Sequence, residues 1–223
     1  MVTECFFPDR DSLFAALLIE CTDKLNTAIE QKKTATLLVS GGGTPKPLYQ
    51  QLSCASLDWQ KVNVALVDER WVDANQSGSN ETFISTNLLI NNAATANYIA
   101  MKGPEASAIL GQPTCEQRYQ QMSAPFDLTL LGMGSDGHTA SLFPQAQGLA
   151  EALDTKNNNL CVAINANPSD VTGELTERMS LSLAGLLQSR ELHLLITGED
   201  KLAVYKQALI SSDETLTPIS ALL

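Results

Sequence analysis

Two titratable residues, Asp136 and His138, stand two positions apart in a glycine-rich segment of the chain. A neutral histidine ring can take a proton from water at neutral pH, and a nearby carboxylate can orient either the ring or the water. The only other histidine, His193, lies inside an apolar run that predicts a strand, so we expect a structural role for it. The pair therefore predicts general-base chemistry at His138.

The segment that carries this pair reads FDLTLLGMGSDGHTASLFP, from Phe126 to Pro144. Residues 128–131 predict a buried strand, and the glycines after it allow a ligand to approach the backbone closely. Ligands of open α/β sheets bind at the carboxyl ends of the strands, where this loop is expected. The loop matches the dinucleotide pattern G-x-G-x-x-G, but Pro144 follows too soon for the long helix that this pattern opens. A glycine turn without chemistry is the second alternative, and the histidine beside the aspartate counts against it.

A second glycine-rich loop, SGGGTP at residues 40–45, follows a predicted buried strand at residues 36–39. Its proline is typical of the first turn of a helix, which we expect over residues 46–52. A strand, a glycine turn and a helix start in this order aim backbone N–H groups at an anion. The Walker pattern is absent, and a flexible turn is the alternative. We expect this loop to bind phosphate through three of its residues, Gly42, Gly43 and Thr44.

Asp68 and Arg70 follow the next apolar run, residues 62–67, which also predicts a strand. Charges at the end of a strand usually form a solvated exit. Because two other strands end in glycine loops, the same charges can instead point into a cleft that all three ends share.

Two further cations are expected in the first turns of helices. Arg178 falls near the start of a helix predicted over residues 176–189, and Lys201 near the start of one over residues 198–209. The helix dipole favours an anion at this end, so each cation is a candidate for binding one. A surface pair between Arg178 and a neighbouring glutamate is an equally simple alternative.

The spacing of apolar residues along the rest of the chain indicates the fold. Apolar residues from Phe14 to Ile29 recur at three- and four-residue spacing, which predicts a long amphipathic helix. Further strands are expected at residues 160–164 and 192–197, and residues 91–112 show no clear pattern. Strands that alternate with helical segments predict an α/β fold: a Rossmann-like, mainly parallel sheet with helices on both faces, in one domain over residues 1–223.

Composition excludes several classes of protein. The 223 residues are 44% hydrophobic and 17% charged, as in a soluble globular protein, and the net charge of −11 repels nucleic acid and anionic membranes. The five cysteines are scattered without a metal-binding spacing, which favours reduced thiols in the cytoplasm. We find neither a signal peptide nor an apolar run long enough to span a bilayer.

Several segments, taken together over nearly the whole chain, resemble the 6-phosphogluconolactonase family. The thirteen-residue stretch GMGSDGHTASLFP at residues 132–144 is the most specific of them. The others are SGGGTP at 40–45, DERWV at 68–72, SN at 79–80, RMSLS at 178–182, GEDK at 198–201 and the ending PISALL at 218–223.

This resemblance implies a cytoplasmic hydrolase that uses neither metal nor cofactor and opens 6-phosphoglucono-δ-lactone to 6-phosphogluconate in the oxidative pentose phosphate pathway. It implies a fold shared with glucosamine-6-phosphate deaminases and ribose-5-phosphate isomerases. We expect His138 to activate water, with Asp136 and Asp68 as the other catalytic residues. The substrate phosphate is expected at Gly42, Gly43, Thr44, Arg70, Arg178 and Lys201. The sugar-phosphate lactone is the expected partner of a monomer or weak homo-oligomer, with no nucleic acid and no membrane.

Two positions depart from the family pattern: Gly43 replaces a serine found in many relatives, and Asp73 replaces a proline. The lost hydroxyl is expected to weaken phosphate contact slightly. The rival enzymes are amino-sugar-phosphate deaminases or isomerases on the same fold, which carry tyrosine after the Asp-Glu pair, where this chain has Arg70. A sugar-phosphate sensor without catalysis is the rival from another class, and the intact pair of Asp136 and His138 counts against it.

Overall fold

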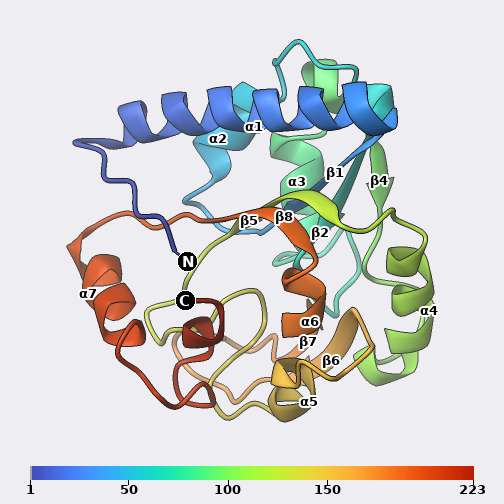
Figure 1. Ribbon diagram of the computed structural model, residues 1–223. Helices are drawn as coiled ribbons and strands as arrows, with labels where there is room; N and C mark the ends of the chain where they lie inside the picture. Colours follow the sequence, from blue (N-terminus) through green and yellow to red (C-terminus); the bar gives the residue numbers. More distant parts are fainter. Residues whose placement is uncertain (1) are drawn as a thin grey trace.

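The computed structural model describes residues 2–223 and contains two β-sheets with helices around them (Figure 1). The larger sheet has five strands in the order β4-β2-β1-β5-β8, and each neighbouring pair is parallel. Its strands are β1 (Ala35–Val39), β2 (Val62–Leu66), β4 (Asn97–Ile99), β5 (Phe126–Leu131) and β8 (Ser189–Leu194). The mainly parallel sheet confirms the fold class expected from the sequence.

The smaller sheet is antiparallel and has three strands in the order β3-β7-β6. These strands are β3 (Asp68–Arg70), β7 (Glu177–Leu181) and β6 (Cys161–Asn165). In Figure 1, β6 and β7 gather at the bottom of the view with two short helices, on the opposite side of the molecule from α1. The helices are α1 (Arg10–Lys32), α2 (Lys46–Leu52), α3 (Asn80–Asn87), α4 (Ala108–Gln120), α5 (Leu149–Leu153), α6 (Leu183–Leu186) and α7 (Glu199–Ala208).

The long first helix is confirmed, and both of its ends follow from local chemistry. Asp9 caps the start because its carboxylate accepts a hydrogen bond of 2.8 Å from the backbone N–H of Ser12. Lys33 ends the helix in the left-handed region, with φ of 68°, and its N–H bonds to the carbonyl of Ile29. The apolar stripe of α1 packs on β1 and β5, so it covers the centre of the parallel sheet.

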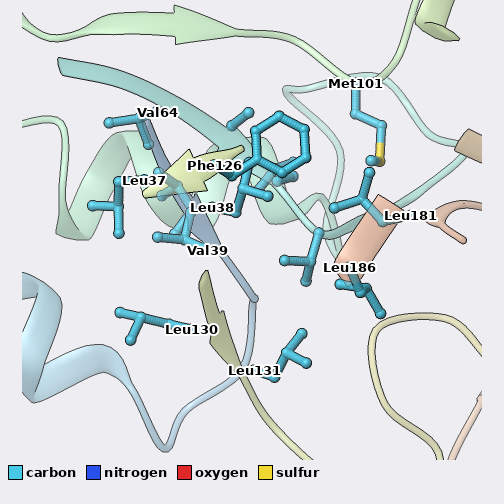
Figure 2. Packing of buried hydrophobic residues seen from close by; sticks show 14 of the residues in the cluster. Leu37, Leu38, Val39, Val64, Met101, Phe126, Leu130, Leu131, Leu181 and Leu186 are labelled. Carbon is cyan, nitrogen blue, oxygen red and sulfur yellow. The ribbon is translucent and has the colours of Figure 1, made fainter. Parts of the chain in front are cut away.

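A continuous hydrophobic core joins the two sheets. All five residues of β1 are buried, as expected for a strand in the middle of a covered parallel sheet. Figure 2 shows side chains of β1 and β5 in the same core as Leu181 of β7 and Leu186 of α6. Because the core is shared, residues at the ends of the parallel strands and residues of the small sheet are held in one fixed arrangement.

The chain passes from one sheet to the other at Val67. Val67, between β2 and β3, donates its N–H to the carbonyl of Val39 in β1, at 3.0 Å. Its own carbonyl accepts from the N–H of Leu181 in β7, at 2.8 Å. The chain therefore passes from the parallel sheet to the antiparallel sheet without an intervening loop.

Two details of the sequence prediction were wrong. Residues 176–189 do not form one helix, because residues 177–181 are strand β7 and only Leu183–Leu186 are helical. Met179, Leu183 and Leu186 imitate a helical spacing, although residues 178–183 also alternate between polar and apolar side chains, which is the pattern of a strand. The last strand begins and ends three residues earlier than expected. For residues 91–112, where no prediction was made, the structure shows the 3₁₀ turn at 91–95, strand β4 and the start of α4.

Candidate active site

The histidine and aspartate pair lies in the loop after β5 and is held in direct contact. The Nδ1 atom of His138 lies 2.5 Å from Oδ1 of Asp136, and the same oxygen accepts the backbone N–H of His138 at 3.2 Å. The two side chains are 19% and 28% exposed, so solvent and ligands reach both. Burial acts to raise the pKa of Asp136, but the hydrogen bonds and charge of His138 outweigh it and leave this pKa lowered.

The glycines of this loop are needed for the pair to form. A Cβ atom on Gly134 would lie 2.0 Å from Nδ1 of His138 and 2.4 Å from Oδ1 of Asp136, so no side chain fits there. Gly137 has φ of 80°, in the region that glycine adopts most readily. The segment from 132 to 148 contains no long helix, which agrees with the exclusion of a dinucleotide fingerprint.

Phe143 connects the histidine to a buried arginine. The rings of His138 and Phe143 are tilted by 34° with centroids 4.2 Å apart. The guanidinium carbon of Arg178 lies 5.2 Å from the centroid of the same Phe143 ring. Phe143 is 3% exposed, so this contact is part of the core and limits the rotation of the histidine.

Arg178 lies on β7, not at the start of a helix as the sequence predicted. Its guanidinium donates through Nε to the carbonyl of Leu175, at 2.6 Å, and through Nη2 to that of Thr172, at 3.0 Å. Burial lowers its pKa, the charge of Arg70 lowers it further, and Asp68 opposes both effects. Arg178 is therefore a buried cation in a sheet, and its burial, not a helix dipole, is the reason to expect an anion beside it.

Arg70 and Arg178 are direct partners across the antiparallel strands β3 and β7. Like charges in directly opposite positions repel and destabilise a sheet. Asp68, on the same strand as Arg70, offsets part of this positive charge. A bound anion would offset the remainder, so the pair is a physical reason to expect an anionic ligand here.

Asp68 is buried instead of forming a solvated strand end. Its Oδ2 accepts a hydrogen bond of 2.6 Å from Oγ of Ser141, in the same glycine-rich motif as His138. The side-chain amide of Asn80 donates to its backbone carbonyl at 2.9 Å. This contact network brings the end of β3 to the motif that follows β5, which favours the shared cleft over the solvated exit.

Asn80 also links Arg70 to the first glycine loop. Its Oδ1 accepts from Nη1 of Arg70 at 2.7 Å, and its side chain is packed against the backbone of Gly41. A Cβ atom on Gly41 would lie 2.0 Å from this Oδ1. Gly42, Gly43 and Thr44 follow at the carboxyl end of β1, where the sequence placed them, and Gly42 has φ of 96°.

Replacing Gly41 by alanine is expected to lower the free energy of unfolding by about 1–3 kcal/mol, because the new methyl group would displace Asn80. Gly43→Ala is the matched control: a Cβ atom there meets nothing within 4 Å, and its φ lies outside the left-handed region. Urea unfolding of both variants checks this. Equal stabilities for the two would show that Asn80 does not pack tightly against the loop.

Lys201 lies in the first turn of α7, as predicted, and faces the histidine loop. Its Nζ donates to the carbonyl of Met133 at 2.6 Å. Burial lowers its pKa and the charge of Asp136 opposes this, which places the two side chains in one electrostatic environment. The other histidine, His193, lies in β8, and its Nε2 is 3.6 Å from Oε1 of Glu20 on α1.

Sequence reasoning missed three residues that hold this site together. Phe143 and Ser141 lie inside the recognised motif but were given no role, and Asn80 was noted only as part of the resemblance. Burial is what identifies them, since they are 3%, 0% and 2% exposed, respectively. No local pattern signals that a serine or asparagine will be buried against a distant carboxylate.

Within residues 2–223, no three side chains of His, Cys, Asp or Glu gather as a metal site would require. A shallow cavity of about 610 Å³ lies between α1 and α2, away from the residues described above. Its walls contain neither carboxylates nor imidazoles nor cations: Leu18, Pro47, Gln50, Gln51, Cys54 and Ala55. In the described part of the chain, no helix has the length and apolar character needed to cross a membrane.

The family model described as glucosamine-6-phosphate isomerases/6-phosphogluconolactonase matches residues 8–223. The chain belongs to this family. A 6-phosphogluconolactonase of Rhizobium meliloti (strain 1021) is 37% identical over 97% of this chain and 91% of its own length. One from Pseudomonas aeruginosa is 35% identical over 93% of this chain and 85% of its own length.

The fold agrees with this assignment. The crystal structure of a 6-phosphogluconolactonase from Shewanella baltica OS155 matches with a TM-score of 0.91 and 38% identity, covering 100% of this chain and 94% of that one. A putative 6-phosphogluconolactonase from Neisseria gonorrhoeae FA 1090 matches with a TM-score of 0.86 and 32% identity, over 99% and 93% of the two chains. The resemblance inferred from the sequence motifs is confirmed.

Proposed function

We propose that this chain hydrolyses 6-phospho-D-glucono-1,5-lactone to 6-phosphogluconate, with a water molecule activated by His138 and without a metal ion. The observation that carries the proposal is the contact of 2.5 Å between His138 and Asp136, in a chain whose similar relatives are named 6-phosphogluconolactonases. The other activity in the family description, isomerisation of an amino-sugar phosphate, is the rival that the assay must exclude.

The contact with Asp136 supports Nε2 of His138 as the ring nitrogen that acts as the base. An ionised carboxylate can only accept hydrogen bonds, so Nδ1 of His138 carries the proton and donates it in the hydrogen bond to Asp136. The lone pair is then on Nε2, which takes a proton from the attacking water. Water adds to the lactone carbonyl carbon, the ring C–O bond breaks, and the proton returns to the leaving oxygen.

The substrate phosphate is assigned to the positive charges around this base. Arg70 and Arg178 oppose each other on paired strands, and Lys201 shares the surroundings of Asp136. The loop residues Gly42, Gly43 and Thr44 add backbone N–H groups and a hydroxyl. This local cluster explains how a chain with a net charge of −11 binds an anionic substrate.

Asp68 is assigned to support the catalytic loop, through its hydrogen bond from Ser141. The negative charge that develops on the carbonyl oxygen needs donors, for which the amides of the 132–137 loop and Arg70 are the candidates. No serine nucleophile is required, because water itself is activated and the G-x-S-x-G elbow is absent from the chain.

The test is the rate of lactone hydrolysis with and without the protein, in the presence of EDTA, because the lactone also opens spontaneously. We expect an acceleration that EDTA does not reduce. No acceleration would refute the lactonase proposal, and release of ammonia from glucosamine-6-phosphate would then identify the rival activity. Acceleration that EDTA abolishes would refute the metal-independent mechanism alone.

A further inference from the structure

Glu69 is the residue of β3 that the proposed mechanism does not use. Side chains alternate along a strand, so Glu69 points away from the face that carries Asp68 and Arg70. It is 1% exposed, which makes it one of the most buried charged residues of the chain. A carboxylate is stable at such a position only when hydrogen bonds replace its water.

Four donors surround this carboxylate. Oε1 accepts the backbone N–H groups of Arg70 and Asn80, each at 2.7 Å. Oε2 accepts the backbone N–H of Glu81 at 2.7 Å and Oγ of Ser79 at 3.1 Å. Three of the four donors belong to the start of α3, where backbone N–H groups lack partners within the helix. Glu69 therefore fastens α3 to β3.

Burial raises the pKa of Glu69 to about 7, although the hydrogen bonds from the backbone N–H groups of Asn80, Glu81 and Arg70 act to lower it. The other charges near it are Asp68, which raises its pKa further, and the guanidinium of Arg178. At pH 8 the group is mainly ionised, and all four donors then have an acceptor.

The residue that Glu69 fixes by its backbone is the one that bridges the site by its side chain. The amide of Asn80 donates to the carbonyl of Asp68 at 2.9 Å and accepts from Nη1 of Arg70 at 2.7 Å. The backbone of Asn80 is therefore fixed by Glu69, while its side chain holds Asp68 and Arg70, whose side chains lie on the other face of β3.

We propose that Glu69 is a positioning residue: it sets Asn80, and through Asn80 the orientation of Asp68 and Arg70. The inference rests on the proposed lactonase function for its kinetic test. The alternative is that Glu69 caps α3 and contributes to stability alone, and the experiments below separate the two roles.

The chemical group matters as well as the size. A glutamine at position 69 would place an NH2 group where an oxygen now accepts, facing at least one of the backbone N–H groups that surround it. Two donors would then oppose each other in a buried place, and the start of α3 would shift. Glu69→Asp retains the charge but places it one methylene group further from the donors. We therefore expect its kcat/KM for the lactone to lie between those of Glu69→Gln and the wild type.

The experiment compares Glu69→Gln with Glu116→Gln at pH 8. Glu116 is a matched control on α4: it is also buried, at 8% exposed, and accepts a backbone N–H from Cys161 at 2.8 Å, but contacts no proposed site residue. Both variants are expected to lose stability. Measured per folded molecule, kcat/KM for the lactone is expected to fall about 10- to 100-fold in Glu69→Gln and to stay near wild type in Glu116→Gln.

A double-mutant cycle with Asn80→Ala tests the route. If Glu69 acts through Asn80, kcat/KM of the double variant is expected to equal that of the less active single variant. The two losses are then not additive. Additive losses, or a Glu69→Gln variant with wild-type kcat and KM, would overturn the inference. Should Glu69→Gln not fold, Ser79→Ala removes one donor to the same carboxylate, and wild-type kinetics in that variant would count equally against it.

A structural measurement keeps this result separate from the proposed function. In the wild type, hydrogen exchange at the side-chain amide of Asn80 is expected to be slow by NMR, and fast in Glu69→Gln. Equal protection in the two proteins would overturn the inference whatever the enzyme does. If the wild type fails to accelerate lactone hydrolysis while this protection is lost in the variant, the proposed function fails and the positioning role stands.

Discussion

A His138→Ala variant is expected to hydrolyse the lactone with kcat about 10²- to 10⁴-fold below the wild type, because it lacks the base that activates water. The phosphate contacts are assigned to other residues, so the affinity for 6-phosphogluconate is expected to change little. Steady-state kinetics corrected for spontaneous opening give kcat, and titration calorimetry with the product gives the affinity.

The second histidine offers the control for this experiment. His193 lies in β8 beside Glu20 of α1 and has no part in the proposed site. His193→Ala is therefore expected to retain kcat. If His138→Ala retained it too, the general-base assignment would be wrong and another group would have to activate water. If product affinity fell together with kcat, His138 would instead be a binding residue.

Asp136→Asn is expected to lower kcat by about 10²-fold or more, although the residue keeps its size. The pKa of Asp136 is lowered, mainly by its hydrogen bonds to His138 and the charge of that ring, so the wild-type carboxyl is ionised at neutral pH and accepts from Nδ1. An asparagine can offer its NH2 group to Nδ1 instead. That contact favours the proton on Nε2 and removes the lone pair needed for catalysis.

The control is Asp127→Asn, at the other end of β5. Asp127 is 4% exposed, pairs with Nζ of Lys32 at 2.7 Å and accepts the N–H of Thr36, far along the strand from the catalytic loop. It is expected to cost stability and to leave kcat unchanged. A double variant of His138→Ala with Asp136→Asn is expected to be no slower than His138→Ala alone. A further loss in the double variant would show that Asp136 orients the water directly and not the ring.

Local signals were sufficient for the elements whose physics is local. The mostly apolar run at residues 128–131 is followed by glycines that a close contact requires, so both the strand and the contact between Asp136 and His138 after it could be predicted. The first helix could be predicted because one stripe of it packs against the sheet. The glycine loop at 40–45 was placed correctly at the end of β1, because the apolar run before it indicated a buried strand.

The small antiparallel sheet could not be predicted, because its pairing is between distant segments. Three charged residues, Asp68 to Arg70, form a buried strand only because β7 lies beside them, more than a hundred positions later in the chain. Asp68–Arg70 contains no apolar residue, and the polar–apolar alternation of residues 178–181 indicates a strand without indicating its partner. The pairing of Arg70 with Arg178 and the four hydrogen bonds of Glu69 follow from this tertiary contact and have no counterpart in a local pattern.

Val67 is hydrogen-bonded to both sheets, and this limits where insertions and deletions can occur during evolution. One residue inserted between β2 and β3 would reverse the side-chain alternation, bringing Glu69 to the substrate side and burying Asp68 and Arg70 behind it. Residues 73–78, a few positions later, are all exposed and can absorb insertions without this consequence. Relatives that act on larger or differently shaped sugar phosphates are therefore expected to differ in length at 73–78. They are expected to keep the four residues, 67–70, that lie between β2 and Trp71.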